Sequence, residues 1–554
     1  MAQATLFLRK ATGLVRSWSV FDAFIYAFFS INLVTLGFYI ISYSYYFEGG
    51  LIPALVISGL IILTEVVVYA GLIAVMPRAG GDYVWQSRLL GGGIGFVLAV
   101  TGWWFILWLW TPLYSDMLRH IFFVPLSAIL GLQDTALWFA WDPNSWMLVS
   151  VLMVAFVAVV IAMGMKAYAR VQKFSFWVGN AGLAVVCVFL LFGNNEAFRA
   201  GLEANATRLF GASPGVYDAT IAAGQAAGGI MPLMGGSLTA IFLVMPYIVF
   251  FNLWPNWGAT LYGEVKGADD FKKNLRAMAY ALIATTVLAI VFFLLVDKTI
   301  TWDFQVNANA AYWNYRWGYT DQAPALAAWP YPAMLAMFLT TSPVLQFVVL
   351  LAMSFWFFGW AGTVFLSSTR VIFAAAFDRI LPEAVASVEP RSRTPIWALI
   401  LMVVPGLIVS ALYIYNVNIF GSGFASITLA SALVIAVTYL GSTIAAILLP
   451  YIKPDLYNAS PIAKYKVLGL PLISVCGVIF AAFLLFLLYQ WLLDPNALYG
   501  IGYSINPDGL KNSASLIFMG AMYLLAIVIY IVARIVRRGQ GIDLDMVYKE
   551  IPAE

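Results

Sequence analysis

The chain has very few of the residues that build metal centres and ionic surfaces. It contains one histidine, His120, and two cysteines, Cys187 and Cys476, among 554 residues. These cannot form a histidine-based metal cluster, and the cysteine spacing fits no metal site. Only 10% of the residues are charged, against about 25% in ordinary soluble domains. We therefore expect no metal or cofactor, no nucleic-acid partner and no enzyme activity.

Long apolar runs take the place of charge. Hydrophobic residues make up 63% of the chain and the mean hydropathy is +0.90. Because about 20 apolar residues cross a bilayer as a helix, the sequence predicts an all-α polytopic membrane protein. The predicted spans are twelve, at about 19–47, 51–76, 94–124, 145–167, 171–193, 236–262, 277–297, 341–370, 395–416, 424–450, 468–493 and 514–536.

The basic residues are distributed unevenly between the two sides of these spans. If the N-terminus is cytoplasmic, 23 of the 29 Lys and Arg residues fall on the cytoplasmic side and six on the outer side. Basic loops stay on the cytoplasmic side of membranes. The split predicts a multi-pass protein of the cell membrane with both termini in the cytoplasm.

The sixth span is interrupted in its middle by the sequence Asn252-Leu253-Trp254-Pro255-Asn256. Proline lacks an N–H and disfavours helix at the residue before it, so we expect the helix to break here. In hydrocarbon, unpaired backbone groups occur only where protein or a wet cavity surrounds them. The break indicates either a binding site or a proline kink that neighbouring helices satisfy.

The first span carries a weaker signal of the same kind. Ser30, Asn32, Thr35 and Gly37 interrupt an otherwise apolar helix. Spans one and six lie five apart, and five is odd, so a second five-helix unit would cross the membrane in the opposite orientation. Paired interrupted helices in inverted repeats are typical of a transporter binding site. This pairing favours the binding-site interpretation.

The predicted organisation follows from these repeats. Its segments are a cytoplasmic N-terminus at 1–18, the first repeat at 19–193, an outer segment at 194–235, the second repeat at 236–450 with an outer segment at 297–332, spans eleven and twelve at 451–536, and a cytoplasmic C-terminus at 537–554.

Two sets of polar side chains within the spans are candidates for ion coupling. Glu65 lies deep in span two, where a charge costs about 2.5–3.5 kcal/mol, so it requires a partner, a proton or a function. It is either a neutral residue that supports packing or a proton-coupling group. Thr363, Ser367 and Ser368 of span eight are possible sodium ligands, although such hydroxyls more often bond a backbone carbonyl.

The remaining charged residues near the spans have structural explanations. Asp22 follows Ser19 at the spacing of a helix cap. Asp116, Arg119 and His120 lie at i, i+3 and i+4 at the end of span three. This spacing predicts a solvated ion-pair cluster at the outer surface.

Three segments carry a family resemblance: PRAGGDY at 77–83, GEVKGADDFKKNL at 263–275 and TRVIFAAAFDRILP at 369–382. They resemble the inner-face motifs of the amino acid–polyamine–organocation superfamily, and chiefly its amino acid permeases, over about Ser19 to Pro395. The resemblance implies a leucine-transporter-like fold, with a five-plus-five inverted repeat and two C-terminal helices. It also implies a substrate held between broken spans one and six.

In that family the break in span one binds the substrate carboxylate through backbone N–H groups, and the break in span six receives the amino group. The substrate-binding residues that the resemblance implies here are Ser30, Asn32, Val34, Thr35, Gly37, Phe250, Asn252, Trp254, Asn256 and Trp257. Phe250 falls where relatives place an aromatic gate.

The sequence departs from the family pattern at three places. Ile31 and Thr35 stand where relatives usually have glycine. Asn256 stands where an acidic residue is often found, which argues against a dicationic substrate such as a polyamine or arginine. Some proton-coupled relatives keep a lysine within span five, whereas this span has none after Lys173.

We therefore expect a symporter that imports a neutral, apolar amino acid by alternating access, coupled to protons or else to sodium. One alternative is a carrier or exchanger for another small organic amine or a nucleobase-like solute. A membrane-embedded enzyme with Glu65 as base is a second alternative, but no further mid-membrane acid, histidine or cysteine joins that residue in the sequence. A channel would require rings of charged or carbonyl groups, which are not evident.

Overall fold

A computed structural model of the chain describes residues 13–419, 423–427, 429–494 and 512–549. Parts of the predicted cytoplasmic termini, 1–12 and 550–554, lie outside the described residues. Twelve helical segments within the described ranges are long and apolar enough to cross a membrane, which confirms the predicted number of spans.

Spans one, three, six and eight are each built from more than one helical piece. Span one comprises α1 (Val20–Ile31), η1 (Leu33–Gly37) and α2 (Phe38–Ser42); span three comprises α5 (Gly92–Val100), η2 (Thr101–Phe105), η3 (Ile106–Leu109), α6 (Trp110–Leu118), η4 (Arg119–Phe123) and α7 (Val124–Ile129); span six comprises α13 (Leu238–Asn252) and η5 (Trp257–Glu264); and span eight comprises α17 (Pro343–Trp360) and α18 (Thr363–Phe377).

The other eight spans are single helices. They are α3 (Leu51–Val75), α9 (Pro143–Ala162), α10 (Met165–Phe192), α14 (Phe271–Thr299), α19 (Ile396–Ile414), α20 (Leu433–Ile452), α22 (Leu472–Leu492) and α23 (Ser513–Gly539).

Short elements connect the spans. They are α4 (Asp82–Leu89), α8 (Gln133–Trp141), α11 (Asn195–Phe210), α12 (Val216–Ala226), α15 (Trp302–Arg316), α16 (Pro332–Met337), η6 (Glu383–Ala386), η7 (Phe424–Ser426), η8 (Leu429–Ala432), α21 (Pro454–Asn458), η9 (Pro461–Lys464), the hairpin of β1 (Lys466–Val467) and β2 (Leu470–Pro471), and α24 (Leu544–Val547).

The start of α1 illustrates how local sequence sets a helix boundary. The Asp22 carboxylate accepts the Ser19 N–H at 2.8 Å, and the Ser19 hydroxyl accepts the Asp22 N–H at 3.2 Å. Together they satisfy N–H groups that the first turn leaves without acceptors. The Lys173 ammonium on α10 lies 2.8 Å from the other Asp22 oxygen. The prediction of Asp22 as a helix cap is confirmed.

The packing of the spans follows the symmetry of two inverted repeats. Spans two and seven (α3 and α14) pack against each other. Span five packs on span eight (α10 on α17), and span ten packs on span three (α20 on α5 and η2). A two-fold axis that relates spans one to five with spans six to ten produces these equivalent pairs, and it places broken spans one and six together at the centre.

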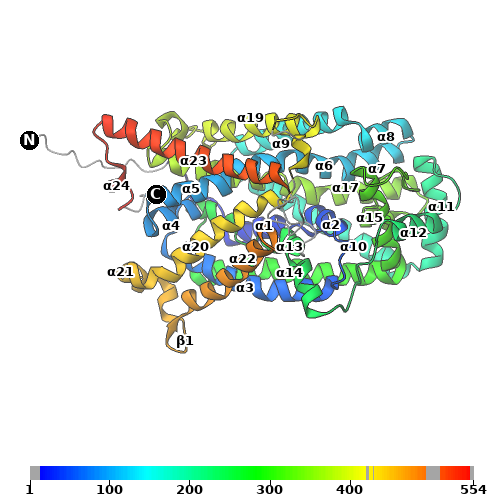
Figure 1. The fold of residues 1–554 in the computed structure, drawn as a ribbon, viewed down its shortest axis with the longest axis horizontal. Coiled ribbons are helices and arrows are strands. Elements are labelled where there is room, and N and C mark those ends of the chain that lie inside the picture. Colours follow the sequence, from blue (N-terminus) through cyan, green and yellow to red (C-terminus); the bar gives the residue numbers. More distant parts are fainter. Residues whose placement is uncertain (1–12, 420–422, 428, 495–511, 550–554) are drawn as a thin grey trace, which may run out of the picture.

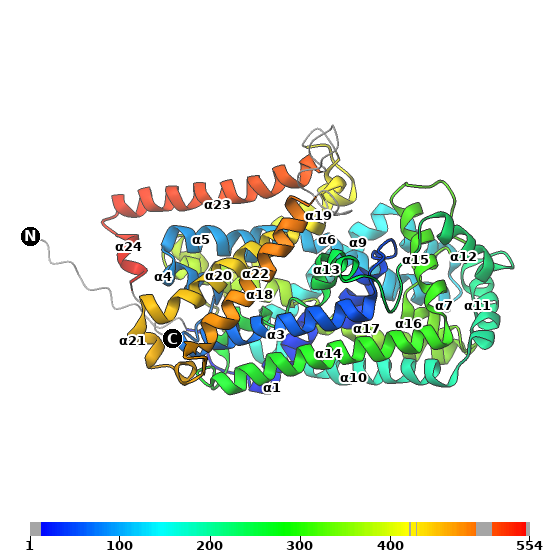
Figure 2. The same cartoon turned by 60° about the horizontal axis from the view of Figure 1, so that its bottom comes forward.

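Spans eleven and twelve lie on the outside of this bundle, where α22 packs on α20 and α3, and α23 packs on α5 (Figure 1). The short helices α4, α21 and α24 lie at one end of the molecule, which we call the proximal end (Figures 1 and 2). The opposite, distal end is formed by α11, α12, α15 and α16 (Figure 2).

Candidate functional site

The helix of span one breaks at Asn32. This residue adopts a left-handed backbone conformation (φ 46°, ψ 84°), which ends α1 and starts η1 in a new direction. The Asn32 side chain accepts the Thr35 N–H at 2.9 Å and donates to the Trp356 carbonyl at 3.1 Å, so it holds the break in place. Because a helix start carries N–H groups without intrahelical acceptors, η1 presents a partial positive charge at mid-span.

The helix of span six breaks between Leu253 and Asn256, as Pro255 predicts. Helix α13 ends at Asn252, and the short helix η5 begins at Trp257. The Trp254 indole N–H folds back to the Phe250 carbonyl at 2.7 Å, which satisfies one carbonyl of the α13 C-terminus. The remaining carbonyls of that last turn carry a partial negative charge.

A small cavity lies where the two breaks meet. Its volume is about 10 Å³, close to the space that one water molecule needs, and it is lined by Ser30, Leu36, Trp110, Tyr114, Trp254, Trp257, Trp360 and Thr363. No charged side chain is among these residues, and all of them are buried. The cavity is therefore closed to solvent, and aromatic side chains form most of its walls.

The aromatic walls are packed in defined geometries. The rings of Tyr114 and Trp360 stack with centroids 3.7 Å apart. Trp254 meets Trp110 edge-on at 5.8 Å and Trp257 edge-on at 5.0 Å. The Trp257 indole donates to the Thr363 carbonyl at 3.2 Å. Such edge-to-face and offset contacts stabilise the walls beyond their buried area.

Sequence reasoning located part of this lining and missed the rest. Ser30, Trp254 and Trp257 were predicted from the broken spans and line the cavity. Trp110, Tyr114 and Trp360 were not predicted, because they come from spans three and eight. The signal available was the density of tryptophan in span three, where residues 103–110 contain four. A buried tryptophan usually places its N–H on a partner; the Trp110 indole N–H has no acceptor among the described residues.

Three predicted residues of span six lie outside the cavity lining in this structure. Phe250 packs edge-on against Trp491 of α22, with ring centroids 5.7 Å apart. Asn252 donates to the Ser58 hydroxyl at 2.7 Å, and Asn256 accepts from Tyr439 at 3.0 Å. Contact of Phe250, Asn252 and Asn256 with a substrate remains a prediction.

The other predicted residues of span one hold the break rather than line the cavity. Val34 and Thr35 are buried in η1. Gly37 faces span six closely, since a Cβ on it would lie 2.8 Å from the Phe251 ring. Because Gly37 has no side chain, the two broken spans can approach each other closely here.

The predicted sodium-binding hydroxyls are engaged in local hydrogen bonds. Thr363 donates to the Trp360 carbonyl at 2.8 Å, and Ser368 donates to the Val364 carbonyl at 2.8 Å. Ser367 donates to the Trp257 carbonyl at 3.2 Å and lies 2.7 Å from the Tyr26 hydroxyl. The contacts of Ser367 tie span eight to spans one and six. A sodium site there remains a prediction.

The proximal end is closed by a buried ion pair. Arg370 of α18 donates to Glu264 at the end of η5 through Nε at 2.7 Å and Nη2 at 3.3 Å, and both side chains are fully buried. The Glu264 carbonyl accepts the N–H groups of Ser17 and Trp18 at 2.9 and 3.1 Å, just before span one. Spans one, six and eight are thereby held together below the cavity.

The distal end is closed by a second charged cluster around Asp116. Its carboxylate accepts from Tyr39 of span one at 3.0 Å, pairs with Arg119, and lies 3.5 Å from His120 and 3.7 Å from Arg316 of α15. The cluster is buried, so its prediction as a solvated surface cluster was wrong. Tertiary packing of α15 covers the end of span three, which local spacing does not show.

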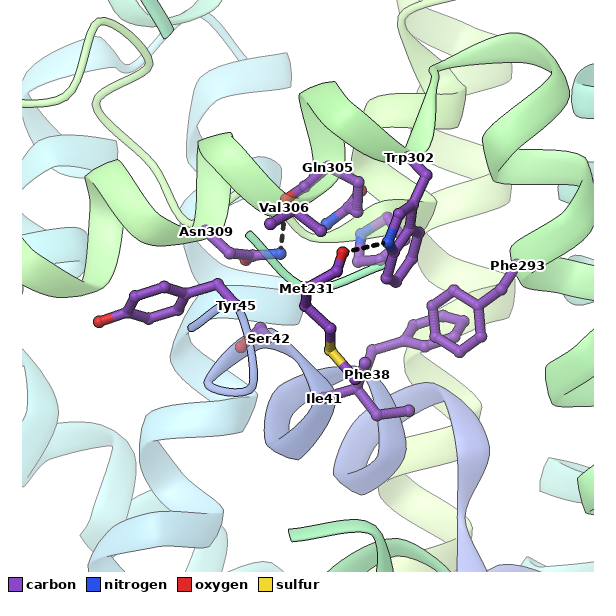
Figure 3. Close-up of a pocket in the computed structure, with 11 residues that line it drawn as sticks. Phe38, Ile41, Ser42, Tyr45, Met231, Phe293, Trp302, Gln305, Val306 and Asn309 are labelled. Carbon is purple, nitrogen blue, oxygen red and sulfur yellow. Dashed lines mark hydrogen bonds between the residues drawn. The ribbon is translucent and has the colours of Figure 1, made fainter. Parts of the chain in front are cut away.

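A further cavity, of about 10 Å³, lies between α15 and the distal half of span one (Figure 3). Gln305, Val306 and Asn309 of α15 face Phe38 and Ile41 across it (Figure 3). The Trp302 indole donates to the Met231 carbonyl at 2.8 Å and anchors the start of α15. The distal helices thus rest directly on span one.

The comparisons with known proteins agree with this architecture. A sequence profile of the amino acid permease family matches residues 19–533. Among solved structures, the crystal structure of MhsT in complex with L-phenylalanine has a similar fold, with a TM-score of 0.54 at 15% sequence identity, over 86% of this chain and 98% of that chain. No curated protein sequence matches this one. The chain therefore belongs to the amino acid permease family and has the twelve-span inverted-repeat fold.

Proposed function

We propose that this permease imports a neutral amino acid with an apolar side chain by alternating access, coupled to protons. The observation that carries the proposal is the closed aromatic cavity between the two broken spans, which has no charged lining residue. A substrate with a net charge would enter this cavity without a counter-charge, which is unfavourable in a low-dielectric interior.

The two helix ends at the cavity suit the zwitterion. The N–H groups at the start of η1 favour a carboxylate, as helix starts do for anions. The carbonyl groups at the end of α13 favour an ammonium group. The aromatic walls formed by Trp110, Trp254 and Trp360 then surround the apolar side chain.

The closed ends at Glu264–Arg370 and Asp116–Arg316 support alternating access. Neither route to the cavity is open in this structure, so each turnover requires one cluster to separate while the other stays closed. The distribution of basic residues supports a cytoplasmic proximal end and cytoplasmic termini. The complex of the structurally similar MhsT with L-phenylalanine is consistent with a substrate that has a large apolar side chain.

Thermal unfolding of the purified protein with each of the twenty amino acids, with and without sodium, tests the proposal. A ligand that binds only the folded state stabilises it by about 2.7 kcal/mol at 100 times its Kd. We expect the largest rise in melting temperature with large apolar amino acids, no requirement for sodium, and loss of the rise in Trp254→Ala. A larger rise with arginine or putrescine contradicts the proposal.

A further inference from the structure

A stripe of buried polar side chains runs along α3 from the break in span six to the proximal end. Ser58, Glu65 and Tyr69 lie at helical spacing on one side of α3 and are fully buried. Ser58 accepts from Asn252 at the end of α13 at 2.7 Å. Tyr69 donates to the Asp82 carboxylate at 2.7 Å, at the start of α4. The stripe thus connects the binding-site break with an inner connecting helix.

Asp82 is only half satisfied. Its Oδ1 accepts both the Tyr69 hydroxyl at 2.7 Å and the Ser442 hydroxyl of α20 at 2.6 Å. Its Oδ2 accepts no hydrogen bond of ordinary geometry from the described residues, although the Trp103 indole N–H interacts with the carboxylate, and the side chain is fully buried. Leaving a carboxylate oxygen unpaired in a dry interior is costly, whereas a proton on that oxygen removes the charge.

Glu65, one turn along α3 from Tyr69, is also a buried carboxyl group with unpaired oxygen atoms. Both of its carboxyl oxygens lack a hydrogen-bond partner among the described residues. It interacts electrostatically with Asp82, and the Tyr439 hydroxyl interacts with both carboxyl groups. Tyr439 in turn donates to Asn256 in the break of span six at 3.0 Å. Two unpaired carboxyl groups therefore share one buried polar region.

The described residues supply no cation to this region. The buried arginines of neighbouring elements pair elsewhere: Arg370 with Glu264 at 2.7 Å, and Arg88 with Asp378 at 2.5 Å. On the other elements packed against α3, Cys476 of α22 is a buried thiol and Glu264 of η5 pairs with Arg370. The basic residues of η9 and α14 are exposed: Lys464, Lys272, Lys273, Arg276 and Lys298. The facing titratable groups on α3 and α20 are the two phenols, Tyr69 and Tyr439.

We propose that Glu65 and Asp82 together form the proton-binding site that couples transport, with Asp82 as the member that exchanges protons with the proximal side. The proposal rests on the function proposed above. In the coupling step a carboxylate oxygen takes a proton to form an O–H bond and later releases it, with no change of oxidation state. Two neighbouring carboxyl groups in a low dielectric do not both stay ionised, so they titrate as a pair.

The chemistry of the site favours a proton over sodium. Two hydroxyl groups point their hydrogens at Asp82 Oδ1, which repels a metal cation from that oxygen. Burial raises the pKa of Asp82 to about 6 although hydrogen bonds from Ser442 and Tyr69 lower it. A group with that pKa gains and loses a proton within the physiological range.

The turn before Asp82 links the site to movement of span six. The Gly80 N–H donates to the Thr260 carbonyl of η5 at 2.8 Å. Gly81 has φ 40°, and a Cβ on it would lie 2.9 Å from the backbone of Ala259. Asp82 is therefore held directly against η5, so a displacement of η5 that opens the cavity changes the surroundings of this carboxylate.

Infrared titration of the purified protein in lipid nanodiscs tests the site without any substrate. The wild type should show a protonated-carboxyl band that is lost with a midpoint near pH 6, and Asp82→Asn should abolish it. Glu65→Gln should keep this midpoint and remove a second carboxyl signal, which should also change in Asp82→Asn because the Asp82 charge acts on Glu65. Asp269→Asn, an exposed acid at the same end, is the matched control and should leave the titration unchanged.

The titration overturns the proposal if Asp82→Asn keeps a band that titrates near pH 6, if the wild type shows no such band, or if the second carboxyl signal is unchanged in both Glu65→Gln and Asp82→Asn. A second arm uses proteoliposomes and L-phenylalanine as the probe. A pH gradient should concentrate the probe in wild type and Asp269→Asn, and accumulation should fall to the level without a gradient in Asp82→Asn. Accumulation driven by sodium and unaffected in Asp82→Asn overturns the proposal. If the wild type neither binds nor moves any amino acid, the proposed function fails, while the infrared result still decides the proton site.

Discussion

The Glu264–Arg370 pair allows a quantitative test of how the proximal end is closed. Glu264→Gln removes the negative partner and leaves the Arg370 guanidinium, which is fully buried, without a counter-charge. Removing one partner of a buried ion pair destabilises a fold by about 3–5 kcal/mol, because the remaining charge is uncompensated. We expect Glu264→Gln to lower thermal stability by an amount in this range. The unpaired charge destabilises a conformation less when water reaches Arg370. The variant should therefore also favour an open proximal end.

The double variant Glu264→Gln/Arg370→Met separates loss of charge balance from loss of packing. Replacing both partners of a buried ion pair with uncharged side chains is often close to neutral. We expect the double variant to recover most of the stability that Glu264→Gln loses, measured as the melting temperature of the purified protein in one detergent. The pair has no closing role if Glu264→Gln melts as the wild type does. The charge argument fails if the double variant loses the sum of the two single losses, since independent sites are additive.

Three further predictions concern the cavity and the acids around it. Trp110→Phe keeps an aromatic ring but removes the unpaired indole N–H at the cavity. Substrate affinity should therefore fall about tenfold, corresponding to about 1.4 kcal/mol. The control Trp108→Phe alters a tryptophan of the same span outside the cavity lining and should keep the affinity. Because the pKa of Asp82 is raised from 3.8 to about 6, the folded state loses up to about 3 kcal/mol of stability as pH rises through that interval. Asp82→Asn should therefore melt higher than wild type at pH 8 and equally at pH 4, and equal melting at both values contradicts the raised pKa. Asn256→Asp should shift preference toward cationic amino acids by supplying a counter-charge, measured as the ratio of lysine to leucine affinity; an unchanged ratio places the amine end of the substrate elsewhere.

The sequence by itself determined the elements whose causes are local. Twelve apolar runs predict twelve spans because crossing a bilayer requires a continuous apolar helix of fixed length. Pro255 predicts the break in span six because a missing N–H and a clashing ring act on the preceding turn. The cap formed by Ser19 and Asp22 is likewise local, because its two members are three positions apart in the chain. The odd spacing between the two broken spans then predicts that they belong to inverted repeats.

Only the tertiary structure decided which side chains meet. Trp110 and Trp360 reach the cavity from spans three and eight, and their contact with Trp254 leaves no periodic mark in any one segment. Glu65 looked isolated in the sequence because Asp82, with which it interacts electrostatically, belongs to a connecting helix and not to a span. The periodicity of apolar residues in a sequence identifies the buried face of one helix. A site between helices depends on how the faces of several helices pack together, and long-range contacts throughout the bundle set that packing.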